Sequence, residues 1–259
     1  MPTGQPPIRE ITAMNTNWKF SWAVIAALLV IGFTAYRGYR AFHESTPDWL
    51  RLQRRSSPTL PDEVRTPWLA LRQQLDLDTK QTGRPTKSVQ LVAIAKNGKQ
   101  VVVYNLEKLT NPGFAPVREI TVPHWTSDQA IFGYYLTDGT PLTFILRHHP
   151  AYPKVAFLAV ETPAPLAPGT SVAVLRAEKR PLELRPDAAG FCSYSPPRVA
   201  RDETTINAVA IALPAGAILK TYRPEAGAYL TTKGAPFVGW INSRLEARAP
   251  APLVNFKLP

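Results

Sequence analysis

The longest uninterrupted apolar run of the chain lies close to the N-terminus. Residues 20–36 read FSWAVIAALLVIGFTAY and contain no charged residue and no proline. As a helix this run would be about 25 Å long, slightly less than the roughly 30 Å hydrocarbon core of a bilayer. We therefore predict one transmembrane helix with its interface residues over 20–42, after a polar tail at 1–19. A cleaved signal peptide is disfavoured, because no small-residue cleavage site follows the run.

Both ends of this predicted helix carry aromatic and basic residues, which prefer the membrane–water interface. Small residues recur on one helical face, and small faces allow close helix packing in lipid. The run contains no histidine, so it offers no axial ligand for a haem or chlorophyll. Contacts with lipid or a partner helix are predicted for Trp18, Trp22, Ala23, Ala27, Thr34, Tyr36, Arg37, Tyr39 and Arg40.

Residues 43–87 are rich in proline and predict a linker with two short amphipathic helices. The segments TPDWLRLQ, from residue 46, and TPWLALRQ, from residue 66, each place Thr and Pro where helices commonly begin. The first combines tryptophan with arginine, as helices that lie in a membrane interface do. Membrane or partner contacts are predicted for Trp49, Arg51, Arg54 and Arg55. The alternative is that both helices pack on their own domain.

Residues 88–248 alternate between β-branched or aromatic runs and turn residues. Asn97-Gly98 and Asp138-Gly139 each separate two such runs, which predicts two β-hairpins. Strands are predicted over 89–94, 101–104, 115–122, 131–136, 142–146, 154–161, 171–177, 181–185, 205–213, 217–223, 228–232 and 237–243. The fold class is therefore mainly β, a sandwich or barrel-like domain or two small β lobes.

A short internal similarity supports the two-lobe alternative. The sequence VAIA at residues 92–95 recurs at 209–212, and a proline-rich stretch near residue 165 lies between the two copies. The corresponding lobes would be residues 88–162 and 170–248. The tail, residues 249–259, reads as an extended strap that lies on a neighbour.

Composition narrows the possible partners and compartments. The net charge of +11 is spread along the chain without a dense basic block, which disfavours nucleic-acid binding and suits anionic lipid headgroups or an acidic partner. Cys192 is the single cysteine, so no intramolecular disulfide can form. This fits a cytoplasmic domain or a bacterial periplasmic domain large enough to fold without one.

The sequence carries no recognisable catalytic or cofactor motif. It has no glycine-rich phosphate loop, no metalloprotease helix motif and no nucleophile elbow. His148 and His149 are adjacent, so in a strand they point to opposite faces and cannot share one metal ion. Tyr134, Tyr135 and Trp240 are at positions more typical of a core than of a ligand groove. We predict no catalytic residue, no metal and no cofactor.

These features together predict a non-catalytic accessory or assembly subunit of a larger membrane complex, whether respiratory, photosynthetic or secretory. Its partners would be integral membrane subunits and anionic lipid headgroups. One alternative is a membrane-anchored binding or transport module of the envelope, which requires an open β groove. A membrane-tethered enzyme, the second alternative, requires clustered carboxylates or a histidine dyad.

The predicted location is the bacterial inner membrane. Arginines that follow the apolar run favour a cytoplasmic C-terminal domain. The layout of tail, single anchor, proline-rich linker and β domain is more typical of an exported one, so we favour a periplasmic domain slightly over a cytoplasmic one.

Overall fold

The computed structural model describes residues 24, 29–34, 51–126, 130–149, 151–196, 204–225, 227–231, 235–242 and 250–259. The chain divides into two units, residues 1–50 and residues 51–259. Of the predicted membrane helix, Val24 and residues 29–34 fall in the described part, where they are helical and exposed. Within the residues described, no helix is both long and apolar enough to cross a membrane. The predicted contacts Trp18, Trp22, Ala23, Ala27, Tyr36, Arg37, Tyr39, Arg40 and Trp49 lie outside the described residues.

The second unit is mainly β, as predicted. Its described part contains one helix, α2 (Asp62–Thr82). The strands are β1 (Arg51–Ser56), β2 (Thr86–Ile94), β3 (Gln100–Thr110), β4 (Val117–Thr126), β5 (Ala130–Leu136), β6 (Pro141–His149), β7 (Tyr152–Leu166), β8 (Ser171–Pro181), β9 (Cys192–Tyr194), β10 (Ile206–Ala212), β11 (Ile218–Arg223), β12 (Ala228–Thr231), β13 (Phe237–Ile241) and β14 (Leu253–Lys257).

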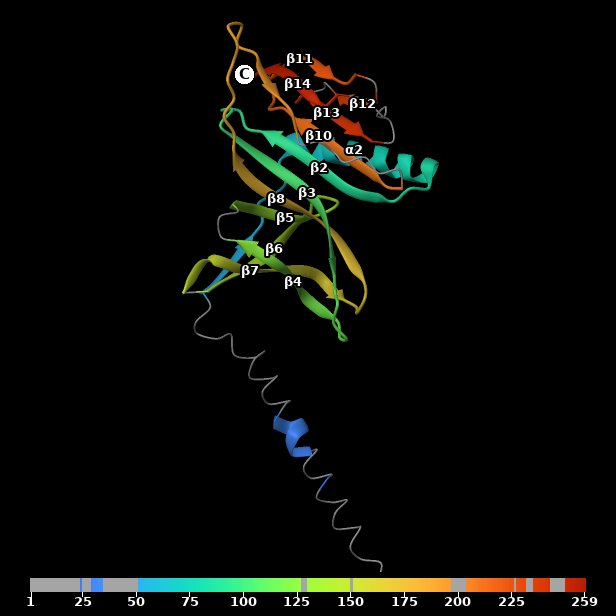
Figure 1. The fold of residues 1–259 in the computed structure, drawn as a ribbon, viewed down its shortest axis with the longest axis vertical. Helices are drawn as coiled ribbons and strands as arrows, with labels where there is room; N and C mark the ends of the chain where they lie inside the picture. The colour runs from blue at the N-terminus through green and yellow to red at the C-terminus, as the bar shows by residue number, and fades with distance from the viewer. Residues whose placement is uncertain are drawn as a thin grey trace, which may run out of the picture. The chain divides into compact units, whose positions relative to one another are not determined.

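These strands form a large open sheet and a small one. The large sheet has the order β12-β13-β10-β2-β3-β8-β5-β6-β7-β4, and β1 pairs with β6 beside this path. The small sheet has the order β11-β14-β9. In Figure 1 the small sheet lies at the end of the unit opposite β4, β6 and β7. Neither sheet closes into a complete barrel.

Helix α2 covers one face of the large sheet. Its buried Trp68, Leu71 and Leu75 lie 3, 4 and 7 positions apart, which places them on one side of a helix, and they pack on apolar residues of β2, β10 and β13. The Trp68 indole N–H donates to the Thr137 carbonyl at 3.0 Å, so this large side chain is buried with its polar group satisfied. The helix ends at Gly83, whose positive φ of 67° suits glycine.

The small sheet covers the opposite face of the same strands. Val92, Ile211 and Trp240 of the large sheet are buried against Val254 and Phe256 of β14. Strand β10 is buried along its whole length, since both of its faces are covered. The strands that carry the two VAIA copies, β2 and β10, are parallel neighbours, with Val92 beside Ile211.

Several predicted boundaries need correction. The predicted first linker helix includes residues 51–53, which instead lie in β1, while the second lies inside the much longer α2. The segment 181–185 lies almost wholly outside the strands. The tail, predicted to be an extended strap, contains β14, which pairs with β11 and β9 of its own chain. The two predicted lobes share one sheet through the pairing of β2 with β10, so they are not separate bodies.

Candidate functional site

Six strands at the β4 end of the large sheet curve around a hydrophobic core of their own. This core is separate from those under α2 and under the small sheet. The six strands follow the order β3, β8, β5, β6, β7, β4, and each neighbouring pair in this order is hydrogen-bonded. We call this arrangement the open barrel. Its buried core residues are Leu109, Ile120, Ile131, Tyr134, Leu142, Phe144, Leu146, Ala156, Leu158, Val160 and Val174.

The open barrel has a seam between its first and last strands. β2 pairs with residues 101–105 of β3 and leaves residues 106–110 with one unpaired edge. β4 pairs with β7 on one side, and no strand of the described part pairs with its other side. An unpaired strand edge presents backbone N–H and C=O groups that can bind another strand. Two such edges therefore border the seam.

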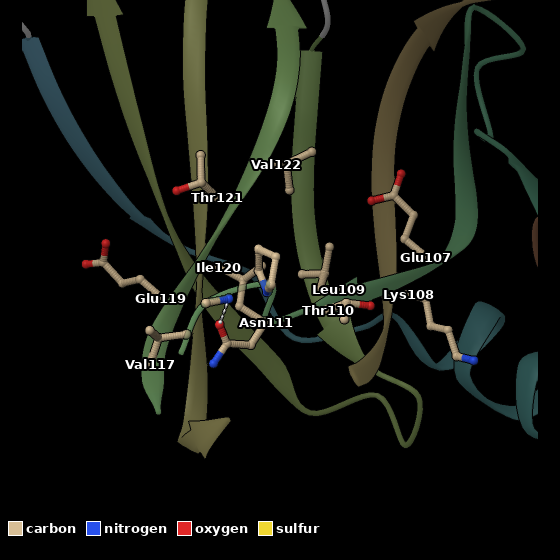
Figure 2. A pocket seen from close by; sticks show the side chains of 12 residues that line it. Glu107, Lys108, Leu109, Thr110, Asn111, Val117, Glu119, Ile120, Thr121 and Val122 are labelled. Atoms are coloured by element: carbon tan, nitrogen blue, oxygen red, sulfur yellow. Dashed lines mark hydrogen bonds between the residues drawn. The ribbon is translucent and has the colours of Figure 1, made fainter. Parts of the chain in front are cut away.

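A groove of about 890 Å³ follows this seam, and we call it the β3–β4 groove. Its lining residues are Glu107, Lys108, Leu109, Thr110, Asn111, Pro112, Gly113, Val117, Glu119, Ile120, Thr121 and Val122. Leu109 and Ile120 are buried in the core below, whereas Val117 and Val122 remain partly exposed. In Figure 2 Leu109, Ile120 and Val122 lie between Glu107 on one side and Glu119 on the other, and Val117 lies below Glu119. The groove thus has an apolar floor and acidic side chains at its borders.

Asn111 fixes the end of the groove where β3 turns towards β4. Its buried side-chain amide donates to the carbonyls of Ala115 at 2.9 Å and Leu166 at 2.8 Å. Its carbonyl oxygen accepts from the backbone N–H of Gly113 at 2.9 Å, the bond drawn in Figure 2. One side chain therefore ties the turn to the end of β7, which keeps the two walls apart and the groove preorganised.

A cluster of charged side chains borders the β3–β4 groove near Glu107. Arg176 of β8 forms ion pairs with Glu107 at 2.7 Å and with Glu178 at 3.5 Å. Glu178 also accepts a hydrogen bond from Arg180 at 2.6 Å. We call these four residues the ion cluster. Glu178 is only 3% exposed, and burial raises the pKa of the Glu107 carboxyl although the Arg176 guanidinium acts in the opposite direction.

The interior of this cluster is closed to solvent. The Tyr134 hydroxyl, Nε of Arg176 and Oε1 of Glu178 are shielded from water and have no hydrogen-bond partner among the described residues. A ligand could not reach these atoms without moving the surrounding side chains. The ion cluster is therefore better explained as a support that holds Glu107 at the groove than as a binding site itself.

A second opening lies on the other side of the open barrel, between β1 and β5. This β1–β5 pocket has a volume of about 490 Å³. It is lined by Gln53, Arg55, Ser56, Ala130, Ile131, Phe132, Phe144, Leu146, His148 and Lys179. Two of these side chains are cationic and none is acidic. The Lys179 ammonium lies 4.3 Å from the centre of the Phe132 ring, a distance typical of a cation–π contact.

The structure places the predicted contact residues of the linker in different environments. Arg55 points into the β1–β5 pocket, whereas Arg54, on the opposite face of β1, pairs with Glu161 at 2.8 Å. The backbone of Arg51 pairs with His148. Thr34 is exposed and donates to the Val30 carbonyl within its own helix. The predicted membrane contacts of these residues stay predictions.

Sequence reasoning missed both the groove and the pocket. A usable signal was present only for the turn, because Asn111-Pro112-Gly113 follows the apolar strand residues of β3. The described residues hold no group of three or more His, Cys, Asp or Glu side chains placed to bind a metal ion. Cys192 is a free cysteine and is buried.

No protein-family model matches the chain, and no curated protein matches it. Among solved structures, the chain is similar to the M1 zinc metallopeptidase of Deinococcus radiodurans, at 12% identity and a TM-score of 0.31. A mutant of a two-domain M1 zinc metallopeptidase bound to L-tryptophan gives the same identity and TM-score. The matches cover 67% of this chain and 42% of the metallopeptidases. A similarity this low carries no argument about the site.

Proposed function

We propose that this chain is a non-catalytic, membrane-anchored assembly protein whose β3–β4 groove binds an extended segment of another membrane-complex subunit. The observation that carries the proposal is the pair of unpaired strand edges that face the same apolar groove. An incoming strand would pair with both edges and bury its alternate side chains against Leu109 and Ile120. An apolar small molecule would leave the edge N–H and C=O groups without that pairing.

Charge at the borders of the groove indicates what the segment contains. Glu107 and Glu119 already pair with Arg176 and Arg147, yet burial keeps the pKa of Glu107 raised. An additional cation would therefore stabilise the Glu107 carboxylate. We propose a segment of alternating apolar residues that carries a lysine or arginine opposite this carboxylate. Enzymatic activity receives less support, because the two clustered carboxylates Glu107 and Glu178 are both neutralised by arginines.

The anchor in this proposal is the apolar run at residues 20–36. If it spans the bilayer, replacing Leu29 and Val30 together by arginine should release the full chain from carbonate-washed membranes. Each arginine near the middle of a span costs about 2.5–3.5 kcal/mol of insertion free energy. Both residues are exposed, so the core of residues 51–259 does not depend on them. The matched change Val30→Leu should leave the protein in the membrane pellet. Pelleting of the double-arginine variant would contradict the anchor.

The groove is tested by crosslinking followed by quantitative binding. A photoreactive amino acid at exposed Thr121 of the tagged full chain should crosslink to one defined segment of an integral membrane protein, identified by mass spectrometry. A synthetic peptide of that segment should bind the purified chain. Val122→Lys should weaken this binding roughly tenfold or more, because a charge then enters the apolar floor.

Position 218 provides the matched control for this experiment. Ile218 is 59% exposed on β11 of the small sheet, away from the open barrel. The same photoreactive group there should give no such adduct, and Ile218→Lys should leave peptide binding unchanged. Equal adducts from both positions, adducts with lipid alone, or a peptide affinity insensitive to Val122→Lys would overturn the proposed function.

A further inference from the structure

Three large apolar side chains are exposed close together where β7 begins. Tyr152 is 62% exposed, and Val155 and Phe157 are each 42% exposed. Val155 and Phe157 alternate with the buried Ala156 and Leu158, so both point to the outer face of the open barrel. The Tyr152 ring lies 4.7 Å from that of His149, whose Nδ1 accepts a hydrogen bond from the Ala151 N–H. These three described side chains therefore form an exposed apolar surface at this end of the β6–β7 hairpin.

This surface lies beside the point at which the chain enters the domain. Arg51, the first residue of β1, pairs with His148 near the end of β6. His148 in turn pairs with Ala156, which lies between Val155 and Phe157 in β7. Residues 37–50 connect the proposed anchor to this strand. Along the chain, β1 is therefore the first strand of the domain to follow the proposed anchor.

Among the side chains that the structure describes at this end, Arg55 and Lys179 form no ion pair with a carboxylate, and both lie in the β1–β5 pocket. On the outer face, Arg54 pairs with Glu161 and Arg147 pairs with Glu119. Inside the pocket, Arg55 donates to the neutral Gln53 side chain at 3.1 Å, and Lys179 lies over Phe132. His148 adds a further nitrogen donor or acceptor. The pocket thus combines positive charge with the apolar side chains of Ile131, Phe132 and Phe144.

We propose that the β1–β5 pocket binds the phosphate of an anionic phospholipid while Tyr152, Val155 and Phe157 enter the membrane interface. The inference rests on the proposed membrane anchoring and adds a lipid preference to it. Arginine and lysine match a phosphate group by charge and hydrogen bonding, and aromatic and aliphatic side chains prefer the interface. The net charge of +11 favours an anionic surface over a second copy of the same chain.

The test uses the full chain inserted in nanodiscs. Because Cys192 is the single cysteine, Cys192→Ser combined with Val155→Cys gives one site for an environment-sensitive fluorophore. We expect blue-shifted emission in nanodiscs of phosphatidylcholine with phosphatidylglycerol, and a smaller shift in phosphatidylcholine alone. Replacing Arg55 and Lys179 together by glutamate should remove the difference between the two lipids. Arg55→Gln with Lys179→Gln should reduce it.

Two controls separate this inference from general charge effects. Lys99→Glu with Arg185→Glu changes the same net charge at two exposed positions outside the pocket, and it should preserve the lipid-dependent shift. A label at position 218 should not respond to phosphatidylglycerol. An inserted chain whose label at 155 is indifferent to phosphatidylglycerol, or to the pocket charges, overturns this inference alone. A chain that does not enter nanodiscs overturns the anchoring as well.

Discussion

Above pH 10 the protein should lose stability steeply, because three buried tyrosines resist ionisation in the folded state. Burial raises the pKa of Tyr104 and Tyr134 far above the usual value of 10, and it raises the pKa of Tyr135 to about 12. In the unfolded chain these phenols release their protons near pH 10. The folded state then binds more protons than the unfolded state, so the free energy of unfolding falls as pH rises. For three tyrosines the slope approaches roughly 4 kcal/mol per pH unit.

Urea denaturation followed by tryptophan fluorescence between pH 9 and the pKa of Tyr135, about 12, would measure this slope. Tyr134→Phe should lower it by about 1.4 kcal/mol per pH unit while changing stability at neutral pH little. The Tyr134 hydroxyl has no hydrogen bond of ordinary geometry to lose, although it lies near the Arg176 guanidinium, and the ring keeps its contact with Phe144 at 5.7 Å between centroids. Tyr152→Phe, at an exposed position, should leave both quantities unchanged. An alkaline slope that Tyr134→Phe does not alter would contradict this explanation.

The parts of the fold that the sequence predicts correctly are those with local signals. The Asn97-Gly98 and Asp138-Gly139 turns join paired strands, and both glycines have the positive φ that such turns require. The strand predicted over 205–213 is β10, and the structure buries every residue of it. In these segments the turn residues and the hydrophobic period favour the same structure, and the tertiary contacts favour it too.

Elements that depend on a distant partner could not be predicted in the same way. β1 is largely polar and has no alternating apolar pattern, and it is a strand because it pairs with β6. The tail likewise becomes β14 through its pairing with β9 and β11. Because β1 is a strand, Arg54 and Arg55 point to opposite faces. If this segment were a helix, the two side chains would lie closer together.

The candidate groove was beyond sequence reasoning for a related reason. It lies between β3 and β4, which are consecutive in the chain but do not pair with each other. Local signals at Asn111 to Gly113 predict a turn there and by themselves suggest an ordinary hairpin. The strands separate because Asn111 is tied to Leu166 and because β4 pairs with β7 instead. Only the complete topology reveals an open seam.

Glu178→Ala should lower the free energy of unfolding by about 1–3 kcal/mol, the range for removing a buried acceptor from its hydrogen-bond donors. Glu178 is 3% exposed and accepts a hydrogen bond from Arg180 at 2.6 Å, while Arg176 lies 3.5 Å away. Its removal leaves the largely buried Arg176 with Glu107 as its single carboxylate. Glu161→Ala removes the partner of the exposed Arg54 and should cost no more than about 1 kcal/mol. Equal losses in the two variants, measured by urea denaturation, would contradict a structural role for Glu178.

A second variant separates stability from function in the ion cluster. Replacing Glu107, Arg176 and Glu178 together by leucine, methionine and leucine removes the buried charges and leaves unpaired only Arg180, whose side chain is 51% exposed. Such apolar replacements of buried ion pairs are often neutral or stabilising, so this variant should recover most of the stability that Glu178→Ala loses. It should nevertheless bind the groove peptide several-fold more weakly, because the carboxylate at the border of the groove is absent. Unchanged affinity in the stable triple variant would show that the cluster supports the fold alone and that Glu107 selects no cation in the bound segment.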